Sequence, residues 1–286
     1  MRKWWLSLRP FSFTASLIPM LFSSVISAND RPFDWFGGVL ACLTGLILHI
    51  IANLFNSYYD WILGHDQPGD SQVVPILLDK KYGTRALYWY GISFLLLGTI
   101  LTIVLGLLYG RLVFWITLVG LATAYFYTVP PIAIKNRGWS LPTVFLTMGL
   151  LMPVNVYLIQ TGNISYRLLF CSLPLALLVT AILQGNELRD YYSDWQHGIV
   201  TLTVRYGQKF GVKLYKLLIL APYFLTIISI ILGYLPVHTI VTLLTLGMAL
   251  NLIRKADQRC FSGIDTATAK LHALFGLCYI LAVITN

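Results

Sequence analysis

Charged residues are scarce in this chain of 286 residues, and their scarcity argues against a water-soluble fold. Asp, Glu, Lys and Arg together make up 11% of the sequence, whereas 57% of the residues are hydrophobic and the mean hydropathy is +0.74. A soluble domain normally carries about 25% charged residues. The composition is therefore typical of an integral membrane protein.

Cysteines are also few, and no polar linker divides the sequence. Cys42, Cys171, Cys260 and Cys278 stand singly without any Cys-x-x-Cys pair, so neither a disulfide framework nor a zinc site is predicted. Without a Pro/Ser-rich linker, we expect residues 1–286 to form a single transmembrane domain. The start of the sequence shows no transit region and no small-residue cleavage site, which favours a prokaryotic cytoplasmic membrane.

Long apolar stretches are abundant, and each is long enough to cross about 30 Å of hydrocarbon. They predict an all-α, polytopic membrane protein with about nine transmembrane helices around a central cavity. The expected helices are 12–27, 35–56, 86–108, 112–129, 141–159, 168–183, 217–235, 237–253 and 267–285. Nine crossings would place the two termini on opposite sides of the membrane.

The basic residues test this topology independently of hydropathy. With nine spans, 17 of the 20 Lys and Arg residues fall on one side, and only Arg31, Arg111 and Arg167 fall on the other. Because basic loop residues concentrate on the cytoplasmic side, we expect a multi-pass protein of the cell membrane with a cytoplasmic amino terminus. The net charge of +9 would then face anionic headgroups or an anionic substrate rather than nucleic acid.

The few acidic residues are grouped in the sequence. Seven of the 11 lie in or beside two expected cytoplasmic loops, 60–85 and 189–216. These seven are Asp60, Asp66, Asp70, Asp79, Glu187, Asp190 and Asp194. Taken singly, each Asp fits a solvated loop residue that pairs with a nearby cation. As a group beside long apolar stretches, they indicate a bound metal ion and place the mouth of an active site on the cytoplasmic side.

Spacing and residue type indicate which metal these residues suit. Asn56 and Asp60 are four residues apart, and Asn186, Asp190 and Asp194 repeat that spacing, so on a continuous helix each set lines one face. Carboxylate and amide oxygens are hard ligands that favour Mg2+ or Ca2+ over zinc. Mg2+ completes its shell with water and phosphate oxygens, which predicts a diphosphate substrate. A basic rim is available in Arg9, Lys80, Lys81, Lys135, Arg137 and Arg189.

These motifs resemble the intramembrane aromatic prenyltransferases of the UbiA type, most closely the 1,4-dihydroxy-2-naphthoate polyprenyltransferases of menaquinone biosynthesis. The first acidic segment, residues 56–66 (NSYYDWILGHD), is similar to the family motif Asn-Asp-x-x-Asp followed by a further Asp. The second acidic segment, residues 186–198 (NELRDYYSDWQHG), is similar to Asn-x-x-Arg-Asp-x-x-x-Asp-x-x-x-Gly. Further resemblance lies in 9–15, 127–138, 201–207 and 268–277. The chain departs from the family at Ser57, usually Asp, and at Ile199-Val200, commonly Lys-Arg.

The resemblance implies a role for ten residues. It implies that Mg2+ is held by Asp60, Asp66, Asp190 and Asp194, with Asn56 and Asn186 beside them. It implies that Lys135, Arg9 and Arg189 neutralise the leaving diphosphate and that Tyr127 lies near the reacting carbon. The implied reaction is Mg2+-dependent transfer of a polyprenyl group, within the lipid bilayer, from an allylic diphosphate to an aromatic acceptor such as 1,4-dihydroxy-2-naphthoate.

Two other functions use the same residues. A UbiA-like terpene cyclase would ionise the diphosphate and let the cation cyclise without an aromatic acceptor. A non-catalytic binder or transporter of diphosphate lipids would recognise the donor without breaking a bond. Transport is typically associated with inverted repeats and helices broken near the middle of the membrane. Here the acidic segments end helices at one surface, which favours an enzyme.

Overall fold

The computed structural model describes residues 2–66, 68, 73–79, 81 and 83–284, and all regular elements in this part of the chain are helical. Asp70 and Lys80, two of the residues considered above, lie outside the described residues. The main elements are α1 (Arg2–Ser7), η1 (Pro10–Ser12), α2 (Thr14–Asp30), α3 (Trp35–Ile62), α4 (Gly83–Tyr109), α5 (Arg111–Phe126), η2 (Ile134–Arg137), α6 (Ser140–Val144), η3 (Phe145–Leu151), α7 (Met152–Thr161), α8 (Tyr166–Arg189), α9 (Tyr191–Gln196), α10 (Leu202–Tyr206), α11 (Gln208–Ile231), η4 (Val237–Thr245), α12 (Leu246–Asp257) and α13 (Ile264–Ile284).

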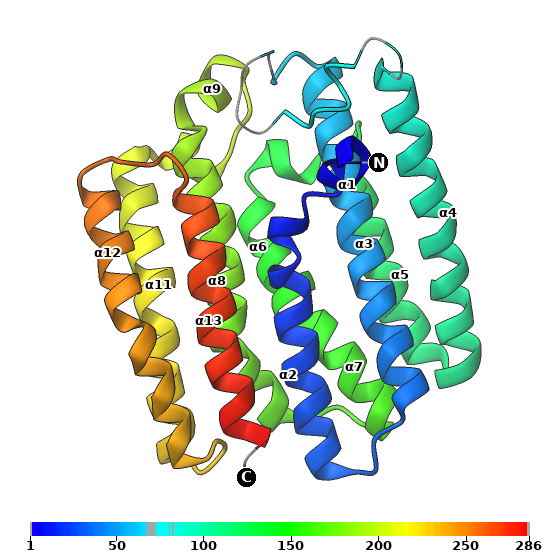
Figure 1. The fold of residues 1–286 in the computed structure, drawn as a ribbon, viewed down its shortest axis with the longest axis vertical. Helices are drawn as coiled ribbons and strands as arrows, with labels where there is room; N and C mark the ends of the chain where they lie inside the picture. The colour runs from blue at the N-terminus through cyan, green and yellow to red at the C-terminus, as the bar shows by residue number, and fades with distance from the viewer. Residues whose placement is uncertain (1, 67, 69–72, 80, 82, 285–286) are drawn as a thin grey trace.

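The predicted all-α membrane architecture is confirmed. Among the described residues, eight helical segments are long and apolar enough to cross a membrane, and α5 is a shorter apolar helix beside them. Three of the eight are composite, since η1 precedes α2, η3 joins α6 to α7, and η4 runs directly into α12. Figure 1 shows these helices standing side by side, with the amino terminus near the end that carries α9 and the carboxyl terminus at the opposite end.

The two helices that carry the acidic segments extend further than hydropathy predicted. Helix α3 continues to Ile62 instead of ending at Asn56, and α8 runs to Arg189 instead of residue 183. Hydropathy detects only the part of a helix that faces hydrocarbon, whereas backbone hydrogen bonding continues into the polar end. Asp190 then interrupts the helix with φ −92° and ψ 4°, and α9 begins at Tyr191. The continuous helix considered for Asn186, Asp190 and Asp194 is therefore wrong.

Helix α8 lies at the centre of the bundle and α4 at its edge. Within its most apolar stretch of 18 residues, α8 is 72% buried inside the protein, whereas the corresponding stretch of α4 is only 22% buried. Aromatic side chains join the helices around α8. The Phe275 and Tyr279 rings of α13 stack with their centroids 5.6 Å apart, and the ring centroid of Phe22 of α2 lies 4.9 Å from that of Tyr279. The Tyr279 hydroxyl donates a hydrogen bond of 2.9 Å to the Cys171 carbonyl of α8. This core holds α2, α8 and α13 together in the part of the bundle away from the polar end.

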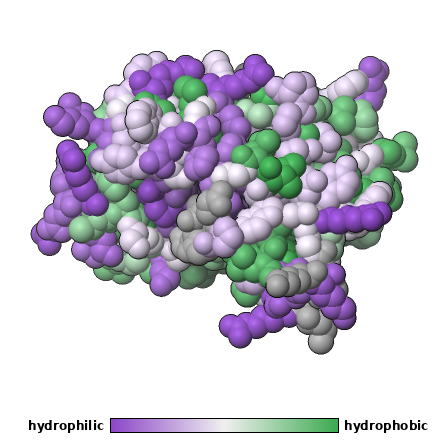
Figure 2. Space-filling view, turned by 90° about the horizontal axis from the view of Figure 1, so that it is seen from above, coloured by the Kyte–Doolittle hydropathy of each residue, from purple (hydrophilic) through white to green (hydrophobic). Residues whose placement is uncertain are grey.

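The polar end of the bundle carries both acidic segments. Viewed from that end, much of the surface is hydrophilic (Figure 2). Arg31, Arg111 and Arg167 adjoin the opposite helix ends, because Arg31 follows α2, Arg111 begins α5 and Arg167 lies at the start of α8. The uneven distribution of basic residues inferred from the sequence is thus present in the fold.

Close packing between η3 and α8 depends on a small residue. A Cβ added at Gly149 would lie 2.7 Å from the Cα of Ala176, and this neighbour is backbone that cannot rotate away. By contrast, a Cβ added at Gly247 in α12 would have no heavy atom within 4 Å. Small residues commonly allow membrane helices to approach this closely.

We therefore expect Gly149→Ala to destabilise the protein by about 1–3 kcal/mol, because η3 and α8 would have to separate. Gly247→Ala is the matched control, and it should be neutral or slightly stabilising because Ala favours helix by about 1 kcal/mol over Gly. Thermal unfolding of both variants in detergent would measure the difference. Equal melting temperatures for the two variants would contradict the packing described here.

Candidate functional site

One cavity brings the sequence-predicted residues together at the polar end of the bundle. All ten of them line it: Arg9, Asn56, Asp60, Asp66, Tyr127, Lys135, Asn186, Arg189, Asp190 and Asp194. The cavity follows α3 from Asp60 to Ala41, a distance of about 28 Å along the helix axis at 1.5 Å per residue. Its deeper walls are largely apolar and include Met20, Leu48 and Val156. A charged entrance thus continues into an apolar interior.

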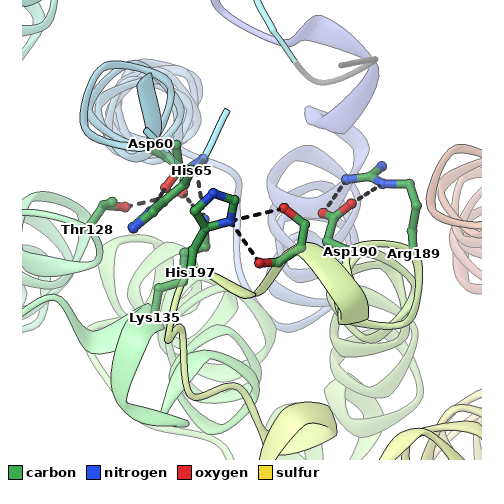
Figure 3. A network of polar contacts seen from close by, with 9 residues as sticks. Asp60, His65, Thr128, Lys135, Arg189, Asp190 and His197 are labelled. Atoms are coloured by element: carbon green, nitrogen blue, oxygen red, sulfur yellow. Dashed lines mark hydrogen bonds and ion pairs between the residues drawn. The ribbon is translucent and has the colours of Figure 1, made fainter. Parts of the chain in front are cut away.

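Asp60 lies at the centre of the hydrogen bonds on one side of this entrance (Figure 3). The Lys135 ammonium donates to Asp60 Oδ2 at 2.7 Å and to Asn56 Oδ1 at 3.2 Å. Asn56 in turn donates to Asp60 Oδ2 at 2.8 Å, and the Thr128 hydroxyl donates to Asn56 Oδ1 at 3.3 Å. Since Asp60 is only 5% exposed, its charge requires such a partner.

The chain reverses after α3 and so brings Asp66 back to Asp60. Gly64 has φ 76°, a left-handed conformation that glycine adopts without steric cost. The turn lets the backbone N–H groups of His65 and Asp66 donate to the Asp60 carbonyl oxygen at 2.8 and 3.0 Å. Asp66 is consequently buried and lines the cavity.

On the other side of the entrance, Arg189 and Asp190 form a two-pronged ion pair. Arg189 Nε and Nη2 donate to the two Asp190 carboxylate oxygens at 2.8 and 2.7 Å. Arg189 Nη1 also contacts the carboxylate of Asp265, a buried residue in the first turn of α13. Sequence analysis missed Asp265, because the only signal was one acidic residue at the start of the last apolar stretch.

The two acidic segments, far apart in the sequence, lie next to each other in the fold. His65 belongs to the first acidic segment and His197 to the second, and their ring centroids are 5.7 Å apart. Figure 3 shows His197 between the Asp60 group and the Arg189–Asp190 pair. The two segments, whose carboxylates the resemblance assigns to one Mg2+ site, therefore line the same cavity at one end of the bundle.

Glu187 belongs to the second acidic segment but serves the packing of the helices around it. Its Oε1 accepts a hydrogen bond of 2.5 Å from Ser140, and its Oε2 accepts from the backbone N–H and hydroxyl of Thr203 at 3.2 and 3.1 Å. It therefore ties α8 to α6 and to the first turn of α10. These contacts assign Glu187 a structural role, although it also lines the cavity.

The concentration of carboxylates changes the acidity of groups at the entrance. Burial raises the pKa of Asp194 to about 7; Lys135 opposes the shift, while Asp190, Glu187 and Asp60 add to it. Burial alone would lower the pKa of Lys135, but the adjacent Asp60 carboxylate outweighs burial and raises it above the ordinary value. Burial and the nearby carboxylates together raise the pKa of the Tyr127 phenol. Lys135 is thus held charged and Tyr127 neutral.

A single compact metal cluster is not present in the described part of the chain. No three Asp, Glu, His or Cys side chains lie close enough there to hold one ion among them. The carboxylates that line the cavity instead come from both acidic segments: Asp60 and Asp66 from the first, and Glu187, Asp190 and Asp194 from the second. Asp60 Oδ1 is buried without a hydrogen bond to any described residue, and His65 Nδ1 lies 3.6 Å from it. An ion held here would share its coordination shell between protein, water and ligand oxygens.

The raised pKa of Asp194 predicts a pH-dependent stability. Between about pH 4 and 7 the folded state keeps a proton that the unfolded chain has lost, so the free energy of unfolding falls as pH rises through this range. Asp194→Asn removes the buried charge and should therefore stabilise the metal-free protein at pH 8 by about 2–4 kcal/mol, with the gain shrinking toward pH 4.

Unfolding of both proteins by denaturant across this pH range would measure the difference. Asp257→Asn is the control, because Asp257 is half exposed and pairs with Lys216 on the surface. This surface variant should change stability by less than about 1 kcal/mol at every pH. A pH-independent effect of Asp194→Asn would contradict the buried charge.

The chain resembles known proteins along nearly its whole length. The model of the UbiA prenyltransferase family matches residues 16–274. UbiA prenyltransferase domain-containing protein 1 of Xenopus tropicalis is 32% identical to it over 285 residues, covering 98% of this chain and 81% of that protein. The human protein of the same name is 31% identical over 285 residues, covering 98% of this chain and 82% of the human protein.

Solved structures share the fold at lower sequence identity. The apo structure of a UbiA homolog from Aeropyrum pernix K1 has a TM-score of 0.73 at 13% identity, covering 96% of this chain and 98% of that chain. A UbiA homolog from Archaeoglobus fulgidus bound to GPP and Mg2+ has a TM-score of 0.64 at 16% identity, covering 99% of this chain and 100% of that chain.

Proposed function

Because the chain belongs to the UbiA prenyltransferase family, we propose that it transfers a polyprenyl group from an allylic diphosphate to an aromatic acceptor such as 1,4-dihydroxy-2-naphthoate. The observation that carries this proposal is one cavity with carboxylates and cations at its entrance and apolar walls beyond them. An anionic diphosphate fits the entrance, and an isoprenoid chain fits the interior. The Archaeoglobus fulgidus homolog, whose structures hold GPP or DMAPP with Mg2+, supports this class of donor.

The residues at the entrance fit Mg2+. They offer the hard oxygen ligands that this ion prefers, and Asp60 Oδ1 is a buried acceptor that lacks a hydrogen bond. The carboxylates that raise the pKa of Asp194 create an excess of negative charge that a divalent cation would offset. We propose that Asp60 and Asp66 on one side, and Asp190 and Asp194 on the other, hold Mg2+ together with water and diphosphate oxygens. When bound, Mg2+ supplies positive charge to the leaving diphosphate.

The cationic side chains would bind the diphosphate and stabilise its departure. Ionisation of the allylic C–O bond leaves its electron pair on the diphosphate, so negative charge grows there in the transition state. Lys135, Arg9 and Arg189 line the cavity and supply fixed positive charge. Charges placed in advance lower the barrier because they interact more strongly with the developing diphosphate than with the intact donor.

The other side chains would protect the allylic cation until it reacts. The raised pKa keeps the phenol of Tyr127 protonated, so no phenolate stands ready to capture the cation. Asn56 holds Lys135 and Asp60 in place, and Asn186 lies on the facing helix. The apolar walls deeper in the cavity exclude water, which would otherwise quench the cation.

We also propose that the entrance faces the cytoplasm of a cell membrane. The multi-pass arrangement follows from the helices, and the entrance lies at the end near the amino terminus. Most of the basic residues lie at this end, as the positive-inside rule expects of a cytoplasmic side.

The function is tested by incubating purified protein with Mg2+ and a radiolabelled polyprenyl diphosphate, with and without 1,4-dihydroxy-2-naphthoate. We expect diphosphate release and a prenylated aromatic product that depends on the acceptor. Hydrocarbon products formed without acceptor would instead identify a terpene cyclase. Donor binding without diphosphate release would identify a lipid-diphosphate binder.

The site assignment is tested by neutralising one carboxylate on each side. We expect Asp60→Asn and Asp190→Asn to lower turnover by about 10²-fold or more, because each removes a preplaced charge that acts on the diphosphate. Asp30→Asn is the matched control: Asp30 lies at the opposite end of the bundle, where it accepts a hydrogen bond of 2.7 Å from Tyr157. This control should keep turnover within about twofold, and full turnover in either site variant would refute the assignment.

A further inference from the structure

The cavity wall contains a polar network that the proposed donor chemistry does not use. His49 lies near the middle of α3, about 17 Å along the helix axis from Asp60, and it lines the cavity although only 7% of it is exposed. Ser12 of η1 also lines the cavity, and Ser16 of α2 is buried beside it. A buried imidazole inside a membrane helix is costly and typically has a function.

Both ring nitrogens of His49 are bound by serine hydroxyls. Ser12 Oγ lies 3.2 Å from His49 Nε2, and Ser16 Oγ lies 3.0 Å from His49 Nδ1. Each hydroxyl also reaches a backbone carbonyl, because Ser12 Oγ donates to the Arg9 oxygen at 2.8 Å and Ser16 Oγ to the Phe13 oxygen at 3.2 Å. The network therefore continues from the ring to the backbone on both sides.

Asn53 joins the network from the next turn of α3. Its Nδ2 donates to Ser12 Oγ at 3.1 Å and to the Leu8 carbonyl at 3.0 Å. These bonds fix the position of Ser12 at the cavity wall. Asn53 lines the cavity as well, so polar groups follow one face of α3 from His49 past Asn53 to Asn56.

The network satisfies both the neutral and the protonated imidazole. In the neutral state with the proton on Nδ1, that nitrogen donates to Ser16, whose hydroxyl donates to the Phe13 carbonyl, and Nε2 accepts from Ser12. In the protonated state both nitrogens donate, and rotation of the Ser12 hydroxyl toward the Arg9 carbonyl makes Ser12 an acceptor. Every donor keeps an acceptor, so uptake of a proton leaves no buried polar group unpaired.

Another buried histidine lacks these partners. His272 in α13 is fully buried, and neither of its ring nitrogens has a hydrogen bond within the described residues. Hydrogen bonds to both ring nitrogens are thus a particular property of the His49 site. Of these two histidines, only His49 lines the cavity.

We propose that His49 accepts, through Ser12, the proton that a hydroxylated aromatic acceptor loses during prenyl transfer. This inference rests on the proposed function. The C–O bond of the donor breaks and its electron pair leaves with the diphosphate, while ring electrons of the acceptor form the new C–C bond. The acceptor hydroxyl passes its proton to Ser12 Oγ as Ser12 passes its own to His49, and the alkylated ring regains its hydroxyl when its C–H proton moves to oxygen.

This assignment separates the two halves of the reaction along α3. Asp60 and Asp190 are bound to Lys135 and Arg189 at the diphosphate end. The Ser12–His49 pair lies deeper, on the wall that an acceptor ring beside the allylic carbon would face. His49 acts through Ser12, so it is a positioning and proton-accepting residue on the acceptor side, without contact to the diphosphate.

The test replaces His49 with Gln, whose amide can hydrogen-bond both serines but cannot take up a proton. We expect His49→Gln to lower kcat for prenyl transfer by about 10²-fold, the usual contribution of a general base. The KM for the donor and Mg2+-dependent donor binding should stay within about twofold, because the diphosphate end is unchanged. Ser12→Ala is the second variant and should show the same pattern, so the test does not depend on the folding of one protein.

A series of naphthol acceptors with increasingly acidic hydroxyl groups supplies the decisive measurement. The loss of kcat in both variants, relative to the wild type, should shrink as the hydroxyl of the acceptor becomes more acidic. An acceptor that ionises by itself needs no base. A purely structural role of His49 would lower transfer equally for every acceptor. Tyr223→Phe is the control: it removes a buried hydrogen bond of 2.8 Å to Thr245 outside the cavity and should leave the acidity dependence unchanged.

Three outcomes would overturn this inference. One is a folded His49→Gln or Ser12→Ala protein that transfers at the wild-type rate to weakly acidic acceptors. Another is a deficit that does not vary with acceptor acidity or that appears equally in donor binding. The third is a wild-type protein that makes no acceptor-dependent product, which would refute the proposed function as well.

Discussion

Burial of carboxylates in an apolar bundle is the constraint on which the site depends. A buried carboxylate is stable only if it is neutralised by a cation, hydrogen-bonded or protonated. The entrance uses all three: Lys135 neutralises Asp60, Arg189 binds Asp190 through two hydrogen bonds, and burial raises the pKa of Asp194 to about 7. The cations that would bind a diphosphate are therefore already in the cavity as counterions. Binding of donor and metal would exchange these partners instead of recruiting new ones.

This exchange explains why the proposed metal ligands do not form a compact cluster within the described part of the chain. With a carboxylate and its cation adjacent at each side, part of the negative charge at the entrance is already neutralised before any ligand binds. Four carboxylates gathered around an empty centre would repel one another, and Asp190, Glu187 and Asp60 already add to the rise that burial causes in the pKa of Asp194. Distributing them over two acidic segments keeps the bundle stable and leaves room for a diphosphate between them.

Sequence alone was sufficient for the helices and for the residues at the entrance. Apolar length predicted nine spans, and the structure has eight long apolar helices with the shorter α5 beside them. The four-residue spacing of Asn and Asp identified residues that line the cavity. The sequence did not predict the interruption of the helix at Asp190, because the polar end of a helix has no hydropathy signal. Asp265 and the contacts of His49 were also missed as parts of the site. Their partners lie 76 residues away for Asp265 and 37 and 33 for His49, so tertiary packing alone brings them together.

The structure also gives the departures from the family pattern a physical meaning. Ser57, where the family usually has Asp, is buried without a hydrogen bond and is not among the residues that line the cavity. Asn56 and Asp60 of the same helix line the cavity, whereas position 57 does not. Having Ser57 in place of Asp therefore removes no carboxylate from the cavity wall. Ile199 differs, because it is buried at the cavity wall, and its N–H donates to the Asp194 carbonyl at 2.9 Å. Under the proposed function, an apolar residue at that point leaves Lys135, Arg9 and Arg189 to balance the diphosphate and makes the proposed Mg2+ ligands more important.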